Sequence, residues 1–141
     1  MGQHSHTSPK HETRVRVRYA ETDQMGVAYY ANYFIWMEIG RVELVRSLGC
    51  NYKELEQSEG LFLSVVGAHC RYLYPATYDQ ELIIRTAVLS SNRRSVEFGY
   101  EILSADPGKL LAEGSTRHMW LNREWRPTRL PEKYEFLLRA G

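Results

Sequence analysis

The chain has 141 residues, which suits one domain with one hydrophobic core. Its 18 Lys and Arg residues balance 17 Asp and Glu residues, so a formal charge of +1 gives no reason to expect a nucleic-acid or acidic-membrane partner. No apolar run approaches the roughly 18 residues that span a bilayer. The two cysteines have neither CxxC spacing nor the density of a disulfide scaffold. We therefore expect a soluble, cytoplasmic protein with free thiols and no membrane partner.

The first twelve residues are polar, lack an apolar signal core and contain three of the five histidines. A flexible chain end rarely preorganises a metal site, so residues 1–12 are predicted to be a flexible tail. Residues 13–141 are predicted to form a single domain, and no metal is expected.

The domain opens with a stretch, residues 13–19, that alternates between apolar and basic side chains. One face holds Val15, Val17 and Tyr19, and the other holds Arg14, Arg16 and Arg18. This period of two predicts a half-buried strand whose arginine face meets solvent.

Residues 34–48 are predicted to form a long helix. Nine of these fifteen residues are large and apolar, and they surround nearly the whole helix axis. Such a helix is stable when it is enclosed. Gly40 inside it costs about 1 kcal/mol against Ala and indicates close packing, and Gly49 is a plausible C-terminal stop.

The rest of the chain is β-like. A short helix or turn is predicted at residues 52–57, strands at 61–72, 80–91, 95–104 and 110–122, and a last short helix at 131–140. Asp106, Pro107 and Gly108 are typical of a tight turn between antiparallel strands. The predicted fold class is α+β, with a curved antiparallel sheet wrapped around one long central helix.

Asp23 lies in a loop with Gly26, between the first strand and the long helix, where a side chain is free to face a cleft. A turn or helix-capping role accounts for the same position. The helix start that follows, near residues 30–33, offers unpaired N–H groups and a partial charge of roughly +0.5, which can polarise a carbonyl oxygen.

The same region is rich in aromatic residues, namely Tyr29, Tyr30, Tyr33 and Phe34. These residues line an acyl pocket or pack in the core. Sequence alone leaves both roles open for Tyr29 and Tyr30 and favours packing for Phe34.

The stretch Y-A-E-T-D-Q-M-G-V-A-Y-Y-A-N-Y, the apolar helix after it and the later R-Y-L-Y-P-A-T-Y-D resemble the hotdog-fold acyl-CoA thioesterases of the 4-hydroxybenzoyl-CoA thioesterase and YbgC-like group. The resemblance covers roughly residues 13–125. It implies a hotdog fold and hydrolysis of a small aromatic or short-to-medium aliphatic acyl-CoA. It implies no cofactor, because coenzyme A is part of the substrate, and a homo-oligomer that is a dimer or a tetramer built as a dimer of dimers.

Carried over residue by residue, the resemblance places the catalytic carboxylate on Asp23, which attacks the thioester carbonyl or activates a water. It places the carbonyl-polarising backbone N–H on Tyr30, with Tyr29, Asn32 and Tyr33 at the substrate pocket. Many YbgC-like members have His where this chain has Tyr30. That departure leaves the backbone role intact and puts any side-chain role in doubt.

Members of this family hold the coenzyme A phosphates with basic residues in a loop between later strands, often across a subunit boundary. Here the loop contains Arg93, Arg94 and Ser95, and guanidinium groups match phosphate oxygens. The alternative is that Arg93 and Arg94 are solvent-exposed arginines in a turn and bind no phosphate.

Two other functions compete with thioester hydrolysis. A hotdog enoyl-thioester hydratase or dehydratase needs a His with an acid, and His69 with Glu38 is the pair that the sequence offers. A non-catalytic acyl-thioester-binding module needs neither. His69 and His118 are each expected to be hydrogen-bonded strand histidines rather than catalysts.

Overall fold

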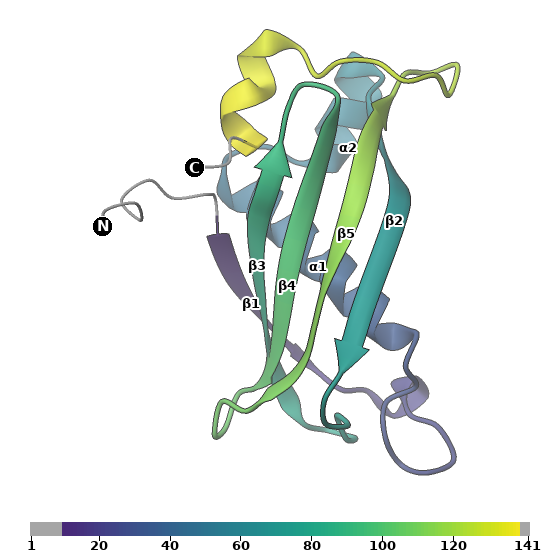
Figure 1. Ribbon diagram of the computed structural model, residues 1–141, viewed down its shortest axis with the longest axis vertical. Helices are drawn as coiled ribbons and strands as arrows, with labels where there is room; N and C mark the ends of the chain where they lie inside the picture. Colours follow the sequence, from purple (N-terminus) through teal and green to yellow (C-terminus); the bar gives the residue numbers. More distant parts are fainter. Residues whose placement is uncertain (1–9, 139–141) are drawn as a thin grey trace.

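The computed structural model describes residues 10–138, which form one five-stranded antiparallel sheet with a long helix across one face (Figure 1). The strands and the helix are β1 (Lys10–Arg16), α1 (Asn32–Ser47), β2 (Phe62–Tyr72), β3 (Glu81–Ser91), β4 (Ser95–Ser104) and β5 (Leu110–Leu121). The strand order is β1-β3-β4-β5-β2, and every neighbouring pair is antiparallel. The α+β class and the sheet-on-helix arrangement are confirmed.

Four short helical segments complete the chain: η2 (Tyr19–Glu21), α2 (Tyr52–Glu54), η3 (Leu55–Glu59) and η4 (Glu132–Leu138). The predicted short helix at residues 52–57 is α2 continued by η3, and the last predicted helix is the 3₁₀ segment η4. Residues 1–9 of the predicted tail lie outside the described residues, and residues 10–12 belong to β1.

The predicted first strand is correct in type but shifted along the chain. It ends at Arg16, and Tyr19 lies in η2 with 77% of its surface exposed. The prediction that Tyr19 shares the buried face of the strand is therefore wrong, because the chain leaves the sheet before reaching it.

The core lies between α1 and one face of the sheet. β4 alternates strictly, and its buried residues Val96, Phe98, Tyr100 and Ile102 share one face. On α1, Trp36, Met37 and Leu44 are at most 1% exposed.

The outward face of α1 differs from the predicted full enclosure. Ile35 is 45% exposed and Glu38 is exposed, because one sheet covers only one side of a helix. Within residues 10–138, no helix is long and apolar enough to cross a bilayer.

Candidate functional site

The segment between η2 and α1 is a small hairpin formed by residues 22–28, which we call the Asp23 hairpin. Thr22 pairs with Ala28, the N–H of Asp23 donates to the carbonyl of Val27 (2.8 Å), and the N–H of Gly26 donates to the carbonyl of Asp23 (3.0 Å). Gly26 has a φ of 82°, a value that favours glycine. The turn therefore places Asp23 at a defined point of the hairpin.

The Asp23 carboxylate is exposed and contacts its own turn. Oδ1 accepts hydrogen bonds from the N–H groups of Met25 (2.8 Å) and Val27 (3.4 Å). This is the turn-capping role that the sequence left open. Asp23 lines none of the five best-formed cavities described among residues 10–138. Its catalytic role stays a prediction, and it requires an acyl site formed beside the hairpin.

The turn before α1 contains the predicted carbonyl-polarising group. The helix begins at Asn32, after i to i+3 hydrogen bonds from Asn32 to Tyr29 (3.0 Å) and from Tyr33 to Tyr30 (3.3 Å). Within the described part of the chain, the backbone N–H of Tyr30 donates no hydrogen bond. That N–H is therefore available to a ligand oxygen at the positive end of the helix.

Tyrosine side chains gather beside this turn. The hydroxyl of Tyr72 donates to the carbonyl of Tyr30 (3.1 Å), and its ring contacts Tyr33 edge-on, with centroids 4.9 Å apart. Burial and the neighbouring Cys70 raise the pKa of Tyr72 to about 12, so its hydroxyl remains a hydrogen-bond donor at neutral pH. A cavity of about 310 Å³ opens here, lined by Ala28, Tyr30, Tyr33, Tyr72, Leu73, Tyr74 and Pro75.

The three predicted pocket residues have different surroundings. Tyr33 is 3% exposed, and its hydroxyl accepts a hydrogen bond from the N–H of Ala76 (3.1 Å), so it is a core residue at the cavity wall. Tyr29 is 47% exposed and packs on Tyr30 with centroids 4.7 Å apart. Asn32 donates its side-chain amide to the carbonyl of Glu21 (2.8 Å) and so has a structural contact.

The predicted phosphate-binding residues form the turn between β3 and β4. Oδ1 of Asn92 accepts from the N–H groups of Arg94 (2.7 Å) and Ser95 (2.9 Å). The guanidinium of Arg93 donates to the carbonyl of Leu130 (3.1 Å), whereas Arg94 is exposed.

This turn lies far from the Asp23 hairpin. Val27 pairs with Thr77 shortly before β3 begins, and Arg93 follows the end of β3. The 11 residues of β3 span roughly 35 Å at about 3.3 Å per residue. Figure 1 shows the β3–β4 turn and the loop before α1 at opposite ends of the molecule. A single chain does not bring the two predicted sites together.

The strand histidines His69 and His118 have different surroundings. His69 is exposed on the sheet face away from α1, beside Arg71 and Ser115, whereas Glu38 lies on α1. The pair nominated for hydratase chemistry is therefore not assembled. His118 is fully buried and hydrogen-bonded, as expected: Nδ1 donates to the carbonyl of Ser64 (3.0 Å), and Nε2 accepts from the hydroxyl of Thr116 (2.7 Å).

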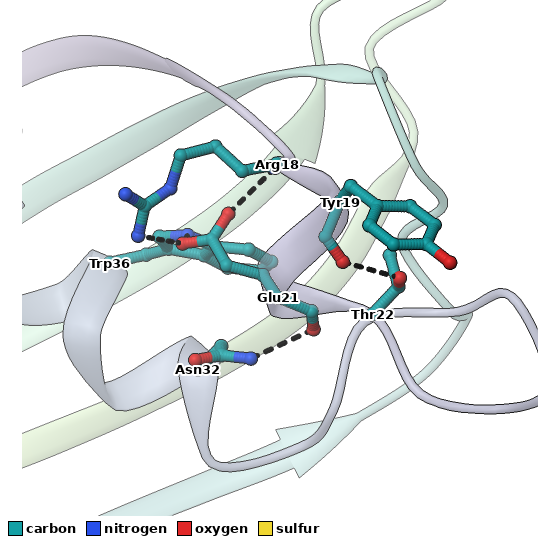
Figure 2. Close-up of polar contacts among 6 residues, drawn as sticks. All are labelled: Arg18, Tyr19, Glu21, Thr22, Asn32 and Trp36. Atoms are coloured by element: carbon teal, nitrogen blue, oxygen red, sulfur yellow. Dashed lines mark hydrogen bonds and ion pairs between the residues drawn. The ribbon is translucent and has the colours of Figure 1, made fainter.

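Sequence reasoning missed Glu21, which is only 4% exposed. Figure 2 shows its carboxylate accepting hydrogen bonds from Arg18 and from the indole of Trp36, while its carbonyl accepts from Asn32. An acidic residue beside a loop is normally solvated, so neither periodicity nor composition indicated its burial.

The sequence profile of the thioesterase-like superfamily matches residues 17–140. The chain belongs to this superfamily. The predicted enzyme class, thioester hydrolase, is thereby confirmed at the level of the family. The chain is 35% identical over 119 residues to YneP of Bacillus subtilis, a protein that carries the name of an acyl-CoA thioesterase. The match covers 84% of this chain and 83% of that protein. It is 33% identical over 92 residues to the acyl-CoA thioester hydrolase YbgC of Escherichia coli O6:H1, covering 65% and 68% of the two chains.

Solved structures confirm the hotdog fold of this superfamily member. The DHNA-CoA thioesterase of Staphylococcus aureus superimposes with a TM-score of 0.82 at 30% identity, covering 85% of this chain and 80% of that one. The 4-hydroxybenzoyl-CoA thioesterase of Pseudomonas sp. strain CBS-3 gives a TM-score of 0.82 at 19% identity, covering 92% and 99%, and shows the fold alone.

Proposed function

We propose that this protein hydrolyses the thioester bond of an aromatic acyl-CoA at the turn before α1. The observation that supports this most directly is the unpaired N–H of Tyr30 beside a tyrosine-lined cavity, adjacent to the Asp23 hairpin. The N–H donates to the thioester carbonyl oxygen and stabilises the negative charge that develops there.

Asp23 acts on the carbonyl carbon in one of two ways. As a nucleophile it forms an acyl-carboxylate anhydride and releases the coenzyme A thiolate, and water then cleaves the anhydride. As a general base it takes a proton from the attacking water, and the thiolate leaves from the tetrahedral intermediate. In both routes the products are the free acid and coenzyme A. A thiolate leaves readily, so neither route needs a strong acid beside the sulfur.

The cavity favours an aromatic acyl group. Its rings, from Tyr30, Tyr33 and Tyr72, offer edge and face contacts to a planar group, and its volume of about 310 Å³ admits one or two rings. A relative of known structure at 30% identity is named for DHNA-CoA. Short-to-medium aliphatic acyl groups are the alternative, and they would use the same walls without the ring contacts.

We also propose that the active enzyme is a homo-oligomer in which a second copy pairs with β2. The sheet has two edges, β1 and β2. The seven-residue β1 edge exposes the charged residues Lys10, Glu12, Arg14 and Arg16, which discourage strand pairing. The eleven-residue β2 edge has one exposed charged residue, Arg71, and it exposes Val65 (54%) and Val66 (52%). The outward face of α1 beside it exposes Ile35.

A second copy on this edge would extend the sheet, cover the apolar side chains and supply a wall beside the Asp23 hairpin. It would also bring Arg94 of one subunit near substrate bound by another. Within one chain, the length of β3 keeps Arg94 too far from the Asp23 hairpin. Native mass spectrometry of the wild type should show a dimer or a tetramer, and Val66→Lys should shift the population to monomers with lower activity. A wild-type monomer with full activity would refute this assembly.

Thiol release from benzoyl-, naphthoyl-, butyryl- and octanoyl-CoA tests the function. We expect the aromatic esters to have the highest kcat/KM, and Asp23→Asn to lower kcat by about 10²- to 10⁴-fold. Asp106→Asn, another exposed loop aspartate, is the matched control and should keep wild-type rates.

Unchanged turnover in folded Asp23→Asn would remove Asp23 from the reaction. Binding of the esters without thiol release by the wild type would support a non-catalytic module instead. Water addition to an enoyl-CoA would support the hydratase.

A further inference from the structure

We propose that Glu21 is a positioning residue, which holds the Asp23 hairpin in a fixed place against the first two turns of α1. This inference rests on the proposed function, because it concerns how the Asp23 carboxylate and the N–H of Tyr30 are held at a fixed position relative to each other. It assigns a role to a buried acid that the proposed chemistry does not otherwise use.

The carboxylate of Glu21 accepts three hydrogen bonds. They come from the backbone N–H of Arg18 (2.8 Å), the guanidinium of Arg18 (3.2 Å) and the indole N–H of Trp36 (3.2 Å). Trp36 is 1% exposed, so its contact with the acid is in the core. A buried carboxylate seldom adds net stability compared with an apolar residue of similar size, although it costs several kcal/mol when it loses its partners. We therefore attribute to the Glu21 carboxylate a role in fixing the position of η2 against α1 rather than in adding net stability.

The backbone carbonyl of Glu21 accepts two more hydrogen bonds, from the N–H of Tyr29 (2.8 Å) and from the side-chain amide of Asn32 (2.8 Å). Figure 2 shows Asn32 and Trp36 both directed from α1 toward Glu21. Residues four apart lie on one helix face, so one side of α1 contacts both the carbonyl and the carboxylate of the same residue.

These contacts hold both ends of the Asp23 hairpin. Asp23 follows Glu21 by two residues, and Tyr30 follows Tyr29 directly. Among the described residues, the bonds from Asn32 and Trp36 are the only side-chain hydrogen bonds between α1 and residues 18–28. The relative placement of the Asp23 carboxylate and the Tyr30 N–H therefore depends on Glu21. A misplacement of about 1 Å at a reacting centre can cost on the order of 10²-fold in rate.

Two variants test the role. Trp36→Phe removes one donor and keeps a buried ring, and Glu21→Gln keeps the shape of the acid but directs an amide N–H at groups that are themselves donors. We expect each to lower kcat by about 10- to 100-fold on the best aromatic acyl-CoA while KM stays within about twofold. Thr116→Val is the matched control: it breaks a buried hydrogen-bonded pair with Tyr100 and His118, and it should lower Tm while leaving kcat unchanged.

Combining each variant with Asp23→Asn separates positioning from general loss of structure. If Glu21 acts through Asp23, Glu21→Gln should lower the residual rate of Asp23→Asn by less than about twofold. An equal loss in both backgrounds, or a kcat that falls only in step with Tm as for Thr116→Val, would overturn the positioning role. Should Asp23→Asn lose activity while Trp36→Phe and Glu21→Gln keep wild-type kcat, the inference fails and the proposed function stands. Full activity in Asp23→Asn would remove Asp23 from the reaction and overturn this inference with it, whereas a wild type that releases no thiol from any of the esters would defeat the proposed function.

Discussion

Gly40 of α1 lies against Thr86 of β3 with no room for a side chain between them. A Cβ at position 40 would overlap Oγ1 of Thr86 and come within 2.9 Å of Cγ2 of Ile84. This close approach brings the middle of the helix down onto the sheet, and it confirms the close packing that a glycine inside a helix indicated.

Gly40→Ala should therefore destabilise the protein, although Ala is the better helix former. The gain in helix propensity is about 1 kcal/mol, whereas overpacking against a β-branched side chain costs about 1–3 kcal/mol, so we expect a net loss of about 1 kcal/mol in urea unfolding. Gly40→Ala combined with Thr86→Ala should recover most of that loss, because the second change removes the overlapping atom. A stabilised Gly40→Ala would show that α1 can move away from β3.

His118 should make stability depend on pH below neutrality. Its burial, followed by the charge of Arg41, lowers its pKa to about 4, so the folded protein holds it neutral. The unfolded chain binds a proton below about pH 6.5, so stability is intact above that pH and decreases as the pH falls from about 6.5 to 4.

The difference in unfolding free energy between pH 7.5 and pH 5 should be larger in the wild type than in His118→Gln by about 2 kcal/mol. Gln is a suitable replacement because it can keep both hydrogen bonds without titrating. If the unfolding free energies of the wild type and His118→Gln changed equally with pH, this would contradict a buried neutral imidazole at His118.

The two arginines of the β3–β4 turn should separate into different roles. Arg93→Ala removes the hydrogen bond to the carbonyl of Leu130 and should lower stability by about 1 kcal/mol. Arg94→Ala should leave Tm unchanged and raise KM for acyl-CoA, more at low than at high salt, because phosphate contacts are screened by ions. If Arg94→Ala raised the KM for the acyl-pantetheine ester as much as the KM for acyl-CoA, this would argue against phosphate binding by Arg94.

Tyr72→Phe should lower kcat by severalfold with little change in Tm. The change removes the hydroxyl that donates to the carbonyl of Tyr30 and keeps the ring contacts with Tyr33. Without that bond the turn that presents the Tyr30 N–H is less constrained. Tyr78→Phe changes an exposed tyrosine that does not line this cavity, so it is the control and should behave as wild type in thiol-release assays. If Tyr72→Phe and Tyr78→Phe had equal rates, Tyr72 would have only a packing role.

Much of the fold was predictable because its signals are local. The strict alternation of β4, the apolar residues of α1 and the glycines at its end and in the β4–β5 turn each depend on backbone geometry within a few residues. Gly49 and Gly108 both have a φ of 92°, as those positions required. The site was predictable only in part: Asp23 was placed in a loop before the helix, but its bond to the turn and the unpaired N–H of Tyr30 needed coordinates.

By itself, then, the sequence determined the order and type of the elements, the family and the candidate residues, since periodicity and turn chemistry act over short distances. Only the tertiary structure decided which residues meet. It buried Glu21 against Trp36, brought Tyr72 from β2 to the turn before α1, and placed Arg93 and Arg94 a full strand away from Asp23. The reason is physical: the spacing of residues along a strand or helix specifies which face they share, but the packing of the sheet against the helix sets the distances between residues that are remote in the chain.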